Sequence, residues 1–134
     1  MWVLLFALAQ DPGSGYDRWY EVLMGDDRVG SMHAVSASSP DGTRRVESST
    51  VMDILRAGTL IHWSMVVESV EGPDGAPLSV RVEQAQGGQA TTSVLRFADG
   101  EALLSVSAGG RELPEARAAY GEAGNSAAFG SLFT

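Results

Sequence analysis

The sequence predicts a mainly β protein, an antiparallel meander of about seven or eight strands. Strand-like runs follow one another along the chain, most of them alternate apolar and polar residues, and Gly-, Asp- and Pro-containing turns separate them. Such regular punctuation is typical of sheets whose successive strands are joined by tight turns. Because one-sided strands need a cover on the apolar face, we expect the sheet to curl into a half-barrel or to be capped by a helix.

Each predicted strand is bounded by turn residues on both sides. In chain order the strands span 19–24, 29–38, 43–56, 59–71, 77–85, 90–98 and 101–108, with a short eighth at 111–113. The first shows the alternation plainly, because Tyr20, Val22 and Met24 share one face. These strands form one predicted domain over residues 19–113.

Residues 43–70 predict the long central hairpin of the sheet, with a two-residue turn at Ala57-Gly58. This turn places Met52 opposite Trp63, and it places Asp53 opposite His62 on the other face. A three-residue loop would instead set Met52 against His62. A shift of one residue in the strand pairing would exchange the buried and the solvent-exposed faces. The two-residue turn separates apolar from polar residues more cleanly than the three-residue loop, so it is favoured.

The apolar face of this hairpin is the one candidate binding surface in the sequence. It comprises Met52, Ile54, Ile61, Trp63, Met65 and Val67. Alternation of this kind is what any packed core strand shows. The functional interpretation is a hydrophobic concavity for a lipid, an apolar peptide or a neighbouring domain, for which large Trp and adaptable Met side chains are suited.

The N-terminal segment predicts export to the periplasm or the extracellular space. Residues 1–9 are apolar and end in Ala7-Leu8-Ala9, the small-residue pattern of a signal-peptidase site, and residues 10–18 predict a flexible linker. The run lacks a basic n-region, so a structural N-terminal strand or helix is the alternative. It is too short to span a bilayer, which takes about 20 apolar residues.

The C-terminal segment, residues 114–134, predicts a short helix followed by a truncated linker. Pro114 suits a first helical position, and Gly121 follows the helix formers up to Tyr120 as a stop. The apolar ending Ala127 to Thr134 looks like a chain cut before its next element.

Composition argues against several classes of function. The net charge of −8 and nine scattered Arg, with no Lys, disfavour nucleic acid as a partner. The absence of Cys excludes disulfides, zinc–thiolate sites and a cysteine nucleophile. No cofactor is predicted.

No catalytic or metal site is predicted either. His33 and His62 are the only imidazoles, and Asp53 opposite His62 indicates a surface ion pair rather than a metal site, because no third ligand is visible. Asp26 and Asp27 are interpreted as turn residues, because a calcium-binding loop would need alternating oxygen ligands over about 12 residues. The many serines lack a Gly-x-Ser-x-Gly elbow.

Several turn motifs resemble the β domain that precedes the catalytic domain in bacterial, notably planctomycete, transglutaminase-like proteins. The motifs are Trp19-Tyr20-Glu21-Val22, the turn Gly25 to Gly30, the long hairpin, and Asp74-Gly75-Ala76-Pro77. In that family the catalytic Cys, His and Asp lie in the following domain, so the resemblance implies no activity for this chain. A weaker resemblance, of architecture only, is to the half-barrel of lipoprotein carriers.

We therefore expect a non-catalytic exported accessory or interaction module of a transglutaminase-like protein. Its partner would be a downstream domain of the same polypeptide or another protein. The alternatives are a carrier or sensor of a hydrophobic ligand and, from the enzyme class, an uncharacterised hydrolase using Ser and His.

Overall fold

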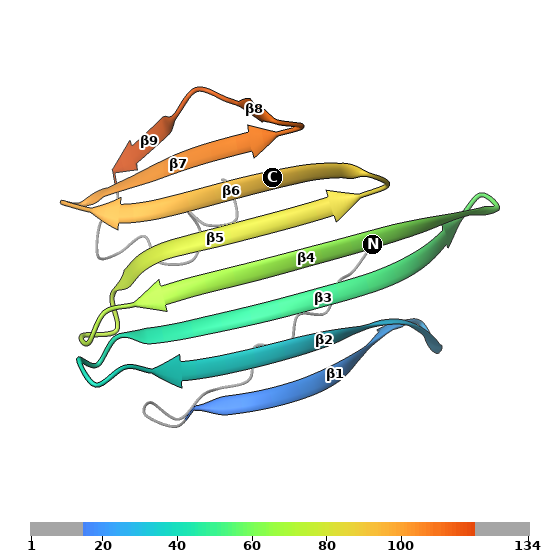
Figure 1. The fold of residues 1–134 in the computed structure, drawn as a ribbon, viewed down its shortest axis with the longest axis horizontal. Coiled ribbons are helices and arrows are strands. Elements are labelled where there is room, and N and C mark those ends of the chain that lie inside the picture. Colours follow the sequence, from blue (N-terminus) through green and yellow to red (C-terminus); the bar gives the residue numbers. More distant parts are fainter. Residues whose placement is uncertain (1–14, 120–134) are drawn as a thin grey trace.

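The computed structural model describes residues 15–119, which form one antiparallel sheet of nine strands in a single open layer (Figure 1). The mainly β meander predicted from the sequence is thus confirmed. The strands are β1 (Tyr16–Met24), β2 (Asp27–Ser38), β3 (Arg44–Arg56), β4 (Thr59–Glu71), β5 (Pro77–Gln86), β6 (Gln89–Ala98), β7 (Glu101–Ala108), β8 (Arg111–Glu112) and β9 (Ala116–Ala119).

The strand order in the sheet follows the chain order. Each strand from β1 to β8 pairs with the next one in sequence, and β9 returns to pair with β7 beyond the end of β8. β1 and the β8–β9 pair therefore form the two edges, and the long β3 and β4 lie inside the sheet (Figure 1).

The predicted register of the central hairpin is confirmed. Met52 pairs with Trp63 and Asp53 with His62, around a turn in which Ala57 has φ 50° and Gly58 has φ 79°. Two successive positive φ angles are the signature of a type I′ turn, whose twist matches that of the flanking strands. The turn at Asp99 (φ 53°) and Gly100 (φ 74°) repeats this geometry.

The predicted curling into a half-barrel is wrong, because the sheet is open and uncurled (Figure 1). Curling is usually produced by bulges or bends within the strands. Here the shifts of register fall between Val22 and Leu23 and between Val70 and Glu71, close to the turns. The ladders in the middle of the sheet therefore have a regular register, without a bulge that would bend the strands.

The predicted C-terminal helix from Pro114 is also wrong over the described residues. Ala116–Ala119 is strand β9, with Ala116 opposite Leu104, and Tyr120 lies outside the described residues. A helix of two turns is marginal on its own. The backbone of β7 beyond β8 offers hydrogen-bonding groups instead, and Arg117 adds ion pairs to Glu101 at 3.7 Å and Glu115 at 3.6 Å.

The ends of the domain differ from the prediction by a few residues. β1 begins at Tyr16, inside the segment predicted as linker, and β9 extends the sheet past Leu113 to Ala119. The predicted signal peptide, residues 1–9, and the predicted linker to a following segment from residue 120 lie outside the described residues.

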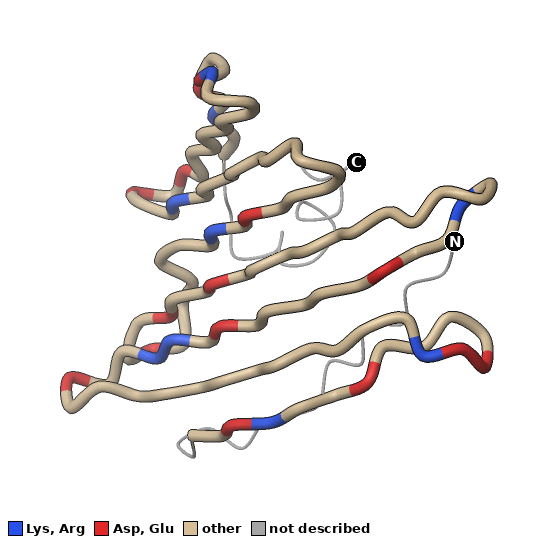
Figure 2. Tube along the Cα trace, turned by 45° about the vertical axis from the view of Figure 1, so that its right-hand side comes forward, with Lys and Arg blue, Asp and Glu red and all other residues tan. Residues whose placement is uncertain are grey.

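The two faces of the sheet differ in character. One face is predominantly apolar, and its buried apolar residues are Ala34, Leu95 and Ala102. The other carries most of the charged side chains. Figure 2 shows long uncharged stretches along β2 and β4. No helix among the described residues is long and apolar enough to cross a membrane.

Candidate interaction surface

The six predicted binding residues lie together on the apolar face, in the positions that the hairpin register gives them. Ile54 faces Ile61, Met52 faces Trp63, and Met65 and Val67 follow along β4. All six are half-buried rather than buried. The only large side chain below 2% exposure in the described chain is Leu95, at 1%. These six residues are therefore not the packed interior of a two-layer core.

The apolar surface continues beyond the hairpin to both sides. Through the paired strands Val67 lies next to Val82, and Val80 next to Leu95, which in turn faces Leu104 on β7. On the other side the face reaches Met32 on β2. We call this continuous surface of β2 to β7 the apolar face. No second layer of secondary structure among residues 15–119 packs against it (Figure 1).

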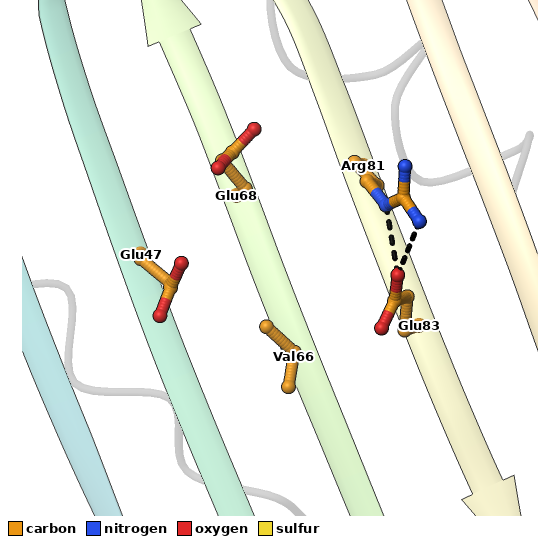
Figure 3. A pocket seen from close by; sticks show the side chains of 5 residues that line it. All are labelled: Glu47, Val66, Glu68, Arg81 and Glu83. Atoms are coloured by element: carbon orange, nitrogen blue, oxygen red, sulfur yellow. Dashed lines mark hydrogen bonds and ion pairs between the residues drawn. The ribbon is translucent and has the colours of Figure 1, made fainter.

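The opposite face carries charged side chains, several of which form ion pairs. Glu47 and Glu68 face each other, and Arg45 relieves this like-charge contact with an ion pair to Glu68 at 3.2 Å. Arg81 donates to Glu83 through Nε at 2.9 Å. These side chains surround a shallow depression of about 180 Å³ (Figure 3). It is open, acidic and flanked by exposed charges, so nothing about it distinguishes a ligand site from a solvated surface.

Each of the two histidines contacts one carboxylate, and the two pairs lie in different parts of the sheet. His62 Nδ1 and Asp53 Oδ1 are 2.7 Å apart, at the tip of the central hairpin, and this is the predicted cross-strand pair. His33 Nε2 lies 2.6 Å from Asp17 Oδ1, on β2 and β1. Among the described residues no three groups of metal-ligand type converge.

The contacts of His33 were missed from the sequence. Its ring stacks on the indole of Trp19 with centroids 4.2 Å apart and planes 8° from parallel, and Trp19 is 70% exposed. Asp17 was placed in the predicted linker, so its alternation with Trp19 was not used. Extending the two-residue period back to Asp17 puts Asp17 and Trp19 on one face, and the pairing of Trp19 with His33 in the β1–β2 register completes the cluster.

The register also places Ser49 of β3 opposite His33, so that a serine, a histidine and an aspartate follow one another across three strands. These are the residue types of a hydrolase triad. Two depressions on this face lie away from these residues, one at Glu47 and Glu83 and one at Ser64 and Thr92. A triad also needs a cavity that binds substrate beside the nucleophile. The hydrolase alternative gains no support from this arrangement.

Comparison of the chain with protein-family models, with curated proteins and with solved structures finds no match.

Proposed function

We propose that this chain is a non-catalytic exported β domain that serves as an interaction module, and that its apolar face packs against a neighbouring folded domain. The observation that carries this proposal is the apolar face itself, which spans six strands of an open single-layer sheet. A soluble protein rarely leaves an apolar patch beyond a few hundred Å² uncovered.

The size of the face suits a protein partner. Six strands of about ten residues, spaced about 4.8 Å apart and rising about 3.3 Å per residue, span roughly 900 Å². This is close to the roughly 800 Å² that each partner contributes to a stable protein–protein interface. The resemblance to transglutaminase-like proteins favours a catalytic domain of that kind as the neighbour.

The flatness of the sheet argues against the carrier alternative. Carriers enclose most of the surface of a small ligand, in a cleft or a cavity. The open sheet forms no half-barrel around the apolar face, and a flat face is complementary to another flat protein surface.

A hydrophobic dye tests the proposal. We expect anilinonaphthalene sulfonate to bind the isolated chain, and Trp63→Gln with Met65→Gln to reduce its fluorescence severalfold. Leu55→Gln with Leu60→Gln is the matched control, because these side chains are 71% and 65% exposed on the opposite face. Equal dye binding by both double variants would contradict the proposal. Saturable binding of one fluorescent fatty acid per chain would favour the carrier instead.

A further inference from the structure

Arg44, at the start of β3, is a charged residue on the side of the sheet that bears the apolar face. It shares that side with Met52, because the two are eight positions apart in a ladder without a register shift. Its side chain is half-buried, and its Nε donates to Ser36 Oγ at 3.1 Å. Ser36 is itself only 4% exposed. The guanidinium therefore lies at the end of the apolar face away from the Ala57-Gly58 turn.

One of the two terminal nitrogens of this guanidinium has no partner. Nη2 of Arg44 is buried from solvent, and within residues 15–119 it meets no hydrogen-bond acceptor. Glu71 lies opposite Arg44 in the ladder with β4, but the two side chains form no ion pair. A buried donor without an acceptor is costly, and such groups are rare in native structures. The described sheet thus leaves one hydrogen-bonding position of Arg44 to be filled from outside.

Arginines in the middle of the opposite face are paired with carboxylates. Arg45, the next residue along β3, pairs with Glu68 at 3.2 Å, and Arg81 pairs with Glu83. The chain has 17 acidic residues against nine arginines, so carboxylates are in excess. Arg44 nevertheless has none within ion-pair distance among the described residues.

A second arginine adds positive charge beside Arg44. Tyr16 of β1 pairs with Ser36, and the guanidinium of Arg18 lies 5.4 Å from the centroid of the Tyr16 ring. Arg18 forms no ion pair with a carboxylate of residues 15–119. With Glu71 counted, this corner is still net positive, although the chain as a whole has a net charge of −8. The corner is therefore complementary to an anionic group.

We propose that Arg44 binds a carboxylate of the neighbouring domain that covers the apolar face, an aspartate or glutamate side chain of that domain. This inference rests on the proposed function and names the group that the partner places at one corner of the contact surface. Since Nε is used by Ser36, the terminal nitrogens Nη1 and Nη2 receive the carboxylate oxygens. Apolar burial has no preferred direction, whereas the ion pair fixes how the partner is oriented on the sheet.

Titration of the whole chain with a small carboxylate tests the site, with backbone amide NMR signals of β2 and β3 as the readout. 3-Phenylpropionate should bind saturably. 3-Phenylpropionamide, the uncharged analogue, should bind about tenfold more weakly, because hydrogen bonds between charged groups are the stronger ones. Arg44→Gln should abolish this preference. Arg45→Gln is the matched control, since it removes the same charge from the opposite face and should keep the preference.

Urea unfolding tests whether Nη2 lacks a partner within the chain itself. Arg44→Met with Ser36→Ala removes the guanidinium together with the hydroxyl that accepts from it. Replacing both members of such a pair by apolar groups is neutral or stabilising, so the unfolding midpoint should stay the same or rise. A lower midpoint would show that the chain already pairs this guanidinium, and it would overturn the proposal.

Equal binding of the acid and the amide, or a preference that survives Arg44→Gln, also overturns the proposal. So does saturable binding of one decanoate per chain at micromolar concentration, which would assign the corner to a fatty acid. These failures differ from a failure of the proposed function. That one is measured by dye binding at Trp63 and Met65, which lie about 20 Å or more from Arg44 along the strands.

Discussion

Gly30 lies so close to β3 that a Cβ atom at this position would be 1.9 Å from the backbone oxygen of Val51. Gly30 is also next to the register shift in β1, where Val22 pairs with Gly30 and Leu23 with Arg28. A glycine inside a strand often marks such a bulge or a close backbone approach. The β1–β2–β3 region therefore depends on the absence of a side chain here.

We expect Gly30→Ala to destabilise the domain by about 3 kcal/mol or more, because the backbone of β3 would have to move. Chemical denaturation measures the loss. Gly25→Ala is the control: it has a positive φ of 64° but open space around it, and it should cost only about 1 kcal/mol. A smaller loss at residue 30 than at residue 25 would show that the strands can separate easily.

Ala57→Asn should stabilise the domain by about 1 kcal/mol. Ala57 has φ 50°, a left-handed conformation that asparagine tolerates better than alanine. Asp99→Asn is the comparison, since Asp99 occupies the same turn position at φ 53° and aspartate already suits it. Thermal unfolding should therefore show a clear rise for the first variant and almost none for the second.

Trp63→Ala should cost about 1 to 2 kcal/mol in the isolated chain, less than a fully packed core tryptophan, because Trp63 is only half-buried. Leu55→Ala, on the opposite face, should cost less than about 0.5 kcal/mol. A loss of about 4 kcal/mol at Trp63 in urea denaturation would mean that the residue belongs to a closed core.

Zinc should not bind the chain at micromolar concentration. His33 and His62 each have one carboxylate partner, and three ligands are needed for a site. Isothermal titration calorimetry of the purified chain with zinc is the measurement. Tight binding that is lost in His62→Ala but kept in His33→Ala would reveal a site at the hairpin tip.

The carboxyl of Asp41 should titrate below its usual pKa of 3.8, because the backbone N–H and the hydroxyl of Thr43 donate to it. Since the folded pKa is the lower one, the stabilisation is present above the unfolded pKa and is lost as the pH falls through the folded pKa. Carbonyl NMR titration follows this directly. Thr43→Val, which removes the hydroxyl, should raise the pKa of Asp41, whereas Thr43→Ser should leave it nearly unchanged.

Two-residue alternation and turn dipeptides are local signals in the sequence. They made it possible to predict the strands, the register of the central hairpin and the shared face of Met52 and Trp63. The curvature of the sheet was not, since it depends on where bulges fall, and a bulge leaves little trace in alternation. The helix prediction at Pro114 relied on local propensity, but a tertiary partner, the edge of β7, determined the structure of Ala116–Ala119. The stacking of Trp19 on His33 was missed because both residues lie in predicted strands but no register was predicted between those two strands.

The strand order has a consequence for how the chain folds. Apart from the return of β9 to β7, every ladder joins strands that are neighbours in sequence. Sheets built only from local hairpins avoid the slow closure of long loops, so this domain should fold fast for an all-β protein. Its cooperativity should resemble that of a linear array, in which each strand is stabilised mainly by its two neighbours. We expect the hairpin of β3 and β4, which has thirteen paired positions, to form first and the other strands to add to it.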